Sequence, residues 1–315
     1  MSADSQPRLS LEASILFAYA TVSLLWGSTY LAIRIGVQYM PPALFAASRF
    51  LLAGLMLLVY ARLTSQPLPN RAVDWRTNII VGLLLLTVGN GLVVWGEQFV
   101  ESGLAAIFIV TSPLWMVLFS ATLPGLRYRP TAIQLVGLVV GFVAAASLIG
   151  IDLEELRNAD WRGPLAILGA AASWSLGSVY SQRHPISSGP VVNSALQMLA
   201  GGIALAVIGL VRGEWQRLEP TWQGVAAVLY LTVFGSVVAF TAYVYLLDHW
   251  PAPIVSSSTY LNVVVAVFLG WLILDETVTV RMLIATGVIF AAVAMVRSPT
   301  PVELSRSPED ATDRS

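Results

Sequence analysis

The sequence contains no cysteine and no lysine, and charged residues occupy only 11% of its 315 positions. Without cysteine the chain can form no disulfide, no thiolate metal site and no cysteine nucleophile. A soluble domain would carry about a quarter charged residues, so a water-soluble globular protein is excluded. The 17 arginines and 18 acidic residues nearly cancel, giving a formal net charge of −1. We therefore expect no binding to nucleic acid.

Long apolar runs take the place of the missing charges. Apolar residues make up 57% of the chain, and its mean hydropathy is +0.75. A membrane-spanning helix needs about 20 apolar residues. The runs therefore predict an all-α integral membrane protein with ten transmembrane helices, at residues 13–33, 43–60, 78–96, 103–123, 131–150, 164–182, 190–211, 222–247, 254–274 and 278–296. The first run exceeds the apolar core of a signal peptide, so we expect it to remain in the protein.

The arginines are distributed unevenly between the two sides that these helices define. With the N-terminus inside, ten arginines fall on the cytoplasmic side and six outside, while Arg49 remains within the second helix. Basic residues favour the cytoplasmic side of membrane proteins. We therefore expect a multi-pass protein of the cytoplasmic (inner) membrane of a prokaryote, with both termini inside.

The two halves of the sequence resemble each other at a nearly constant displacement, close to half the length of the chain. Residues 27–30 (GSTY) align with 177–180 (GSVY), and Trp26 and Trp174 precede these segments. Residues 86–88 and 231–233 are both LTV, residues 53–54 and 200–201 are both AG, and Gly137 aligns with Gly287. Each match is weak alone, but their common order and nearly constant displacement indicate an internal repeat.

Each repeat contains five predicted helices, so the second repeat must enter the bilayer from the opposite side. Inverted repeats can exchange two slightly different shapes and open a central cavity to each side in turn. This organisation predicts a transporter, with a duplicated membrane protein that transports nothing as the alternative. The expected segments are a cytoplasmic N-terminus (1–12), a first five-helix repeat (13–150), an outer connecting loop (151–163), a second five-helix repeat (164–296) and a disordered cytoplasmic tail (297–315).

Several short motifs follow one another through the first half: WGSTY at 26–30, AIR at 32–34, RFLLAG at 49–54, GNG at 89–91, EQ at 97–98, SGLAA at 102–106 and PL at 113–114. Their combination resembles the EamA family of the drug/metabolite transporter (DMT) superfamily, and within it the YedA-like branch. The resemblance extends over roughly residues 15–296. It implies a ten-helix permease with inverted five-helix repeats and a central substrate cavity, and many members export amino acids or other small metabolites.

Arg49 lies near the middle of the second predicted helix, where a guanidinium costs about 2.5–3.5 kcal/mol on insertion scales. We expect it to have a partner: a substrate carboxylate, Glu97, or backbone carbonyls in a purely structural contact. Glu97, beside Gln98, ends the third helix and continues a polar face that includes Asn90, seven residues earlier. A carboxylate near a cavity of low dielectric can bind a proton and couple it to transport. On a hydrated rim it would have no such role.

Aromatic and polar side chains are expected to line the cavity. Trp26 and Tyr30 share one helical face, and Trp174 and Tyr180 occupy related positions in the second repeat. Their rings could hold an apolar or cationic solute.

The ninth helix carries the most polar stretch within any span, in which Tyr260 and Asn262 are the stronger candidates for the cavity. Ordinary packing between helices is the alternative for all of these aromatic and polar residues.

No motif for enzymatic chemistry is present. His184 and His249 stand alone, without a partner at metal-ligand spacing, and the sequence has no phosphate-binding loop or nucleophile elbow. We therefore expect no catalytic residue, no metal and no cofactor.

The expected function is a secondary transporter that moves small organic metabolites by alternating access, as an exporter of amino acids or related solutes. Alternatives are a nucleoside, sugar or drug-like exporter of the same superfamily, an integral membrane enzyme, and a scaffold that transports nothing. The expected partners are a small-molecule substrate, protons and the lipid bilayer, and a homodimer is left open.

Overall fold

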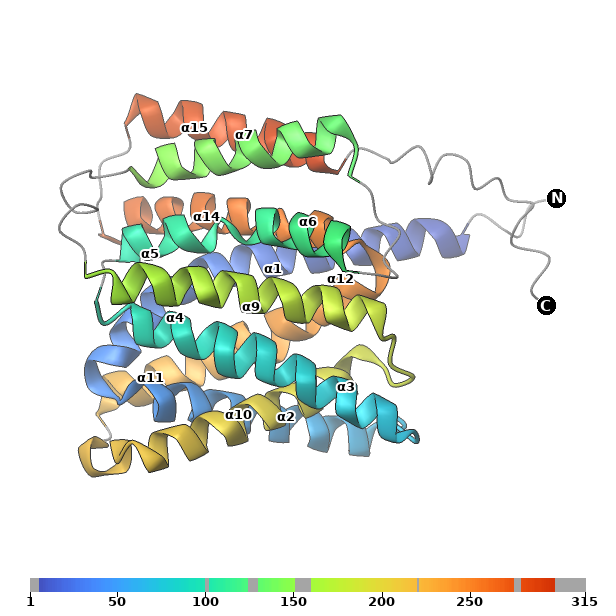
Figure 1. Ribbon diagram of the computed structural model, residues 1–315, viewed down its shortest axis with the longest axis vertical. Coiled ribbons are helices and arrows are strands. Elements are labelled where there is room, and N and C mark those ends of the chain that lie inside the picture. Colours follow the sequence, from blue (N-terminus) through green and yellow to red (C-terminus); the bar gives the residue numbers. More distant parts are fainter. Residues whose placement is uncertain are drawn as a thin grey trace.

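The computed structural model describes residues 6–99, 102–123, 130–150, 160–219, 221–274 and 279–297, and all regular structure within these ranges is helical. Within these ranges the elements form ten helical passes, which lie side by side (Figure 1). Those of the first half are α1 (Gln6–Tyr39), α2 (Pro42–Leu63), α3–η1–α4 (Ala72–Gly82, Leu83–Asn90, Gly91–Gly96), α5–α6 (Ser102–Ile109, Ser112–Thr122) and α7 (Ala132–Ile149).

The second half repeats this order of passes. It comprises α9 (Arg162–Arg183), α10 (Pro190–Val211), the short turn η2 (Glu214–Arg217), α11–η3–α12 (Trp222–Tyr230, Leu231–Val238, Ala239–His249), α13–α14 (Ala252–Ser256, Ser258–Leu274) and α15 (Val280–Val296). Five passes precede α9, so α9 runs in the direction opposite to α1 (Figure 1). The predicted fold class, two inverted five-helix repeats, is confirmed.

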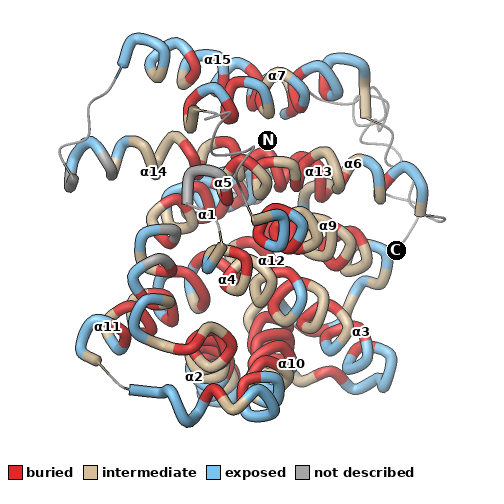
Figure 2. Tube along the Cα trace, turned by 60° about the vertical axis from the view of Figure 1, so that its left-hand side comes forward, coloured by how far each residue is buried: buried red, intermediate tan, exposed pale blue. Residues whose placement is uncertain are grey.

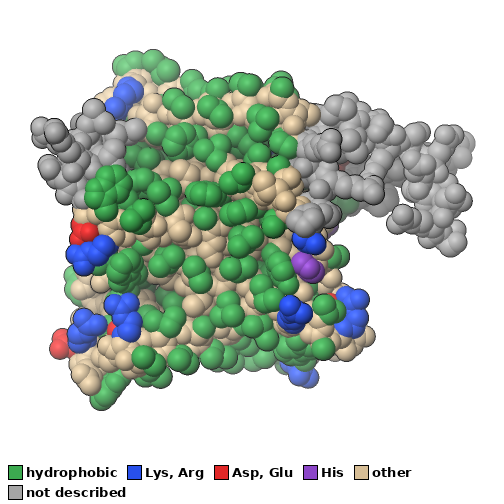
Figure 3. All heavy atoms as spheres, in the orientation of Figure 1, with side chains coloured by type: hydrophobic (Ala, Val, Ile, Leu, Met, Phe, Trp, Pro, Cys, Tyr) green, Lys and Arg blue, Asp and Glu red, His purple; other side chains and the backbone are tan. Residues whose placement is uncertain are grey.

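The lengths and surfaces of these passes suit a lipid bilayer. Eight passes contain at least 18 residues and are apolar enough to cross a membrane, and α15 is a shorter apolar helix. The remaining pass, α9, has 22 residues but carries more polar side chains. Figure 3 shows apolar side chains over the middle of the bundle and charged side chains near its two ends. This distribution matches the apolar core and polar borders of a membrane.

The two ends of the bundle differ in which helices begin or end there. We call the end where α1 begins and α15 ends the terminal side, and the other end, where α2 and α9 begin, the far side (Figure 1). Which of them faces the cytoplasm stays a prediction. The predicted N-terminal segment 1–12 is helical from Gln6 onward, whereas residues 151–159 of the predicted connecting loop and 298–315 of the predicted tail lie outside the described residues.

The two halves are interleaved, so that each contributes to the surroundings of the other. Equivalent helices pair directly, α2 with α10 and α7 with α15. The first pass of each half packs against the third and fourth passes of the other: α1 against α11, α12 and α14, and α9 against η1, α4 and α6. Buried positions lie on the sides that face neighbouring passes (Figure 2). A pseudo-twofold axis therefore passes through the middle of the bundle.

Local sequence explains where several helices begin. Proline, which lacks a backbone N–H, opens α2 and α10 at Pro42 and Pro190, where that N–H would have no partner in the helix. At the start of α7, the Thr131 hydroxyl accepts from the backbone N–H of Gln134, and the Gln134 side chain accepts from the N–H of Thr131. This reciprocal arrangement satisfies two donors that the first turn leaves free.

Candidate functional site

A cavity of about 120 Å³ lies between the two halves. Trp174 and Asn262 stand twelve and ten residues after the start of their passes, about 15–18 Å along a helix and so near mid-membrane. The volume suits several water molecules or a small solute. Both halves supply its lining, which is mostly apolar or aromatic: Trp26, Thr29, Ile33, Arg49, Phe50, Leu86, Gly89, Asn90, Val93, Ile109, Ser112 and Met116 from the first, and Ala170, Ala171, Trp174, Gly235, Phe240, Tyr243, Ser256, Thr259 and Asn262 from the second.

The third pass of each half is irregular where it borders the cavity. Both η1 and η3 are π-helical over eight residues, and they begin at Leu83 and Leu231, at equivalent points of the two halves. π-helical turns are rare and often occur at functional sites. Gly89 in η1 and Gly235 in η3 line the cavity, so the wide turns bring backbone close to any bound solute.

The fourth pass of each half is broken beside the same cavity. The α5–α6 break lies just before Ser112, and the α13–α14 break lies at Ser257. Pro113 follows the first break and cannot donate a backbone hydrogen bond. The Ser112 hydroxyl donates to the Ile109 carbonyl, and the Ser257 hydroxyl donates to that of Ile254, at 2.6 and 2.7 Å. Hydroxyl side chains thus satisfy carbonyls near the interruptions.

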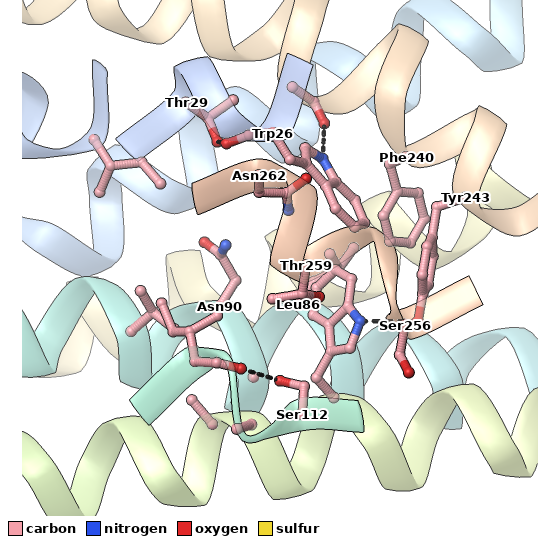
Figure 4. A pocket seen from close by; sticks show the side chains of 18 of the residues that line it. Trp26, Thr29, Leu86, Asn90, Ser112, Phe240, Tyr243, Ser256, Thr259 and Asn262 are labelled. Carbon is pink, nitrogen blue, oxygen red and sulfur yellow. Dashed lines mark hydrogen bonds between the residues drawn. The ribbon is translucent and has the colours of Figure 1, made fainter. Parts of the chain in front are cut away.

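An aromatic wall forms one side of the cavity. The rings of Trp26 and Trp174, which come from equivalent positions of the two halves, meet edge to face with centroids 5.4 Å apart. Tyr243 packs against both, at 5.0 and 5.5 Å, and Phe240 completes the wall beside Trp174 (Figure 4). Contacts of this geometry stabilise a cluster of rings beyond the area they bury.

Hydrogen bonds hold this wall in place. The indole N–H of Trp26 donates to the Gly235 carbonyl at 3.1 Å, and that of Trp174 donates to the Tyr243 hydroxyl at 3.0 Å. The Tyr243 hydroxyl also shares a 2.7 Å hydrogen bond with the Ser178 hydroxyl. The polar atoms of the wall therefore have partners within the protein.

Arg49 brings a positive charge to the cavity. It is the eighth residue of α2, it is only 6% exposed, and its guanidinium carbon lies 4.3 Å from the centre of the Phe50 ring. The nitrogens Nε and Nη1 are buried without a hydrogen-bond partner. Because an unpaired buried charge is costly, this guanidinium is suited to bind an anionic group that enters the cavity.

Two asparagine side chains approach the cavity from opposite halves (Figure 4). In the orientation that its surroundings require, the Asn262 amide nitrogen donates to the carbonyls of Ser23 and Ser258, at 3.0 and 2.9 Å. The Asn90 oxygen Oδ1 is buried without a hydrogen-bond partner. Asn90 therefore offers an acceptor for an N–H or O–H group of a solute.

Other predicted site residues lie away from the cavity. Tyr180 stacks on His184 with ring centroids 4.2 Å apart, and Tyr260 is buried and donates to the Leu138 carbonyl at 2.8 Å. Glu97 follows the last residue of α4 on the far side. Beside it the exposed Gln98 donates to the Trp95 carbonyl.

One predicted side chain, that of Tyr30, lies outside the described residues. Of the remaining predicted residues, the structure brings five together at the cavity: Trp26, Arg49, Asn90, Trp174 and Asn262.

Sequence reasoning missed half of the aromatic wall. Phe240 and Tyr243 belong to a pass that was interpreted only as an apolar span. Their spacing of three residues places them on one helical face, and this spacing was the available signal. Within the described ranges, no group of three or more His, Asp or Glu side chains could hold a metal ion.

Comparisons with known proteins agree with this architecture. The model of the EamA-like transporter family matches residues 13–150 and again 161–298, one match for each half. The chain is 38% identical over 274 residues to the uncharacterized inner membrane transporter YedA of Escherichia coli, with 87% of each chain covered. It is 24% identical over 281 residues to the uncharacterized transporter YoaV of Bacillus subtilis, covering 89% of this chain and 96% of YoaV.

A solved protein structure shares the fold. It superimposes with a TM-score of 0.71 at 23% sequence identity, covering 90% of this chain and 97% of that one. The family match spans most of the sequence in two copies, and YedA shares more than a third of the aligned residues. The chain therefore belongs to the EamA-like transporter family and is a multi-pass membrane transporter.

Proposed function

We propose that the protein is a secondary transporter that exports amino acids or related small organic solutes by alternating access. The observation that carries this proposal is the position of the cavity, at mid-depth and between two inverted halves that both line it. Inverted halves that exchange their shapes would expose such a cavity to each side in turn. The π-helical segments and broken helices beside it provide backbone that can change conformation without disturbing a regular helix.

The polar groups of the cavity suit an amino acid. Arg49 offers free guanidinium donors for a carboxylate, and Asn90 offers a free acceptor for an ammonium group. A charge-assisted hydrogen bond from a guanidinium to a carboxylate is stronger than a neutral one. The ring faces of the aromatic wall would contact the apolar part of the same solute.

Other solutes and other classes of function remain as alternatives to be tested. The aromatic wall could also stack a nucleoside, a sugar or a drug-like ring, none of which needs Arg49. A membrane enzyme would need clustered acidic, histidine or arginine side chains at one depth, and the described lining contains a single charged residue. A scaffold would need neither the cavity nor its free polar groups.

A ligand screen followed by flux measurements tests the proposal. Purified protein is heated with amino acids, nucleosides, sugars and drug-like cations, because a ligand that binds the folded state raises the melting temperature. Each hit is then measured for movement across proteoliposomes in both directions. Stabilisation and flux with amino acids support the proposal. Flux with nucleosides or sugars alone favours the alternative exporters, and absence of all flux with retained partner binding favours a scaffold.

Glu97 is the residue through which we propose that a proton is coupled to transport. It follows α4 on the far side, and its negative charge acts on Arg49. Protonation of Glu97 would therefore alter the electrostatic field at the substrate site. We expect Glu97→Gln to abolish the pH dependence of uptake while leaving exchange of solute intact, with Glu12→Gln at the exposed start of α1 as control. An unchanged pH response in Glu97→Gln would reject the role.

The proposed orientation places the terminal side in the cytoplasm, as the distribution of arginines favours. Because the chain has no cysteine, single cysteines introduced near either end can report which end reacts with an impermeant thiol reagent added outside intact cells. Labelling of the terminal side would reverse the proposed orientation.

A further inference from the structure

The cavity contains one fixed positive charge, and its described lining provides no negative charge. Arg49 is buried, two of its nitrogens have no hydrogen-bond partner, and none of the described lining residues is Asp or Glu. Glu97 acts on Arg49 electrostatically, but its carboxylate does not belong to that lining. The cavity therefore holds a guanidinium that water or a solute must solvate.

The position equivalent to Arg49 in the second half carries no charge. Gln197 is the counterpart of Arg49 and is likewise the eighth residue of its helix. Its neutral amide is buried and donates to the Asn78 side chain at 3.1 Å. When the two halves exchange shapes, the charge of Arg49 is not replaced or cancelled by a symmetry-related side chain. If the helices move as rigid bodies, the positive charge therefore stays in the cavity when the halves exchange shapes.

A carrier whose cavity is open to one side of the membrane must pass through a state closed to both sides before the cavity opens to the opposite side. In that closed state the cavity loses contact with bulk water, and an unpaired guanidinium in an apolar interior is strongly disfavoured. A bound carboxylate pairs with the guanidinium and hydrogen-bonds to it, which offsets most of this penalty. The loaded carrier should therefore change sides much faster than the empty one.

We propose that this protein is an exchanger of carboxylate-bearing solutes, in which the empty cavity returns so slowly that a solute leaves mainly when another enters. This inference rests on the proposed transport of such solutes and adds the mode of transport to it. Arg49 sets the mode because its charge requires a carboxylate whenever the cavity closes. A neutral residue at this position would allow the empty cavity to return.

Three probes of one shape separate the contributions of their charged groups: L-phenylalanine, 3-phenylpropionate, which lacks the ammonium group, and 2-phenylethylamine, which lacks the carboxylate. Proteoliposomes are loaded with each labelled probe, and efflux is followed into buffer alone and into buffer with the same unlabelled probe. We expect external carboxylate to accelerate efflux of a carboxylate probe by about tenfold or more. We expect the amine neither to leave nor to accelerate efflux.

Variants of Arg49 connect this ratio to its charge. Arg49→Lys keeps the charge and should keep the acceleration, with weaker binding of probe. Arg49→Gln copies the second half of the protein and should bring the ratio of the two efflux rates close to one for any probe that still moves. Gln66→Ala, on the surface turn after α2, serves as the control and should match the unmodified protein. If Arg49→Gln does not fold, the ratio of the two efflux rates in the unmodified protein and in Arg49→Lys still tests the exchange mode.

The two proposals fail in different ways. If no probe with a carboxylate binds or moves under either condition, the proposed substrate class is wrong. If carboxylate probes leave equally fast with and without external solute in the unmodified protein, transport stands and the exchange mode is overturned. Equal acceleration in Arg49→Gln and in the unmodified protein would also overturn the role of Arg49.

Discussion

Arg49 in the first half and Gln197 in the second are each the eighth residue of the second helix of their half, yet their surroundings differ. Arg49 lines the cavity with two nitrogens free. Gln197 is buried and bonded to Asn78, which in turn donates to Asn193. The same position lines the cavity in one half and joins the packing of helices in the other. A duplicated backbone can thus keep its symmetry while its chemistry becomes one-sided.

The backbone features of the two halves, by contrast, remain closely matched. Each third pass has an eight-residue π-helical segment, each fourth pass is broken, and Trp26 and Trp174 meet near the pseudo-twofold axis. These are the features that a shape exchange between halves would require. Substitutions at equivalent positions therefore separate what the shared scaffold needs from what one half alone needs.

Glu214 and Gln66 occupy equivalent positions just after the second helix of each half. Of the paired substitutions, those at these two positions should differ most in their effect on the stability of the fold. Glu214 is fully buried, and its Oε2 accepts hydrogen bonds from the backbone N–H groups of Ala43 and Leu44, at 2.9 and 3.0 Å. It therefore caps the free N-terminal donors of α2 with a negative charge. Gln66 lies on a surface turn, and its side chain donates only to the Thr64 hydroxyl among its described contacts.

We expect Glu214→Ala to lower the free energy of unfolding by about 2–4 kcal/mol, because two charge-assisted hydrogen bonds are lost at a buried helix end. Glu214→Gln retains an acceptor and should lose less. Gln66→Ala should change little. Thermal unfolding of the purified variants in detergent measures all three. Equal melting temperatures for Glu214→Ala and Gln66→Ala would show that the cap contributes nothing to stability.

Replacing Gly137 or Gly287 by alanine should change the free energy of unfolding by a smaller amount, and in opposite directions. A Cβ on Gly137 would lie 2.8 Å from the Cβ of Met295 and 2.9 Å from the backbone oxygen of Ala292, whereas a Cβ on Gly287 would meet nothing within 4 Å. Gly137→Ala should therefore destabilise the α7–α15 pair by about 1–3 kcal/mol. Gly287→Ala should stabilise α15 by up to about 1 kcal/mol. Thermal unfolding would refute the comparison if both variants shifted in one direction.

These two glycines also show where the sequence comparison between the halves was wrong in detail. The two family matches begin at residues 13 and 161, and the two π-helical segments begin at Leu83 and Leu231, so both give the same displacement between the halves. Gly137 and Gly287 differ from that displacement by two positions. In that register the counterpart of Gly137 is Ala285, which is buried on α15. Single matches in a small-residue-rich membrane sequence are therefore poor guides to exact register.

Most of the fold could be predicted because its determinants are local. Long apolar runs mark the passes, and an odd number of helices per repeat forces the inversion. The π-helical turns and helix breaks could not be predicted from apolar runs, since they depend on contacts between passes. The Trp26 indole, for example, donates to the Gly235 carbonyl in η3, 209 residues away in the chain.

The lining of the cavity could be predicted only where a residue was unusual for its surroundings. Arg49 stood out because charges are rare inside spans, and Trp26 and Trp174 because they recur at the repeat distance. Tyr243 gave no such signal within an aromatic and apolar pass. Tyr260 seemed a cavity residue because of its polar neighbours, but its hydroxyl bonds to a backbone carbonyl of α7.

The smallest effect is expected from the charge pair just before α9, which among the described residues has no counterpart at the start of the first half. Arg162 donates to both carboxylate oxygens of Asp160, and it holds the pKa of Asp160 below its ordinary value. A lowered pKa means that the pair stabilises the fold at neutral pH and loses this effect as the pH falls below about 4. Because the pair is solvated, its contribution at neutral pH is small.

Glu12 occupies the equivalent position in the first half and is exposed. We expect Asp160→Asn to lower the melting temperature slightly at pH 7 and by less at pH 3, while Glu12→Gln changes neither value measurably. Raising the salt concentration should shrink the difference at pH 7, because solvated charge pairs are screened. A difference between Asp160→Asn and the unmodified protein that grew on acidification would mean that Asp160 acts through its protonated form, and the pairing with Arg162 would not be its role.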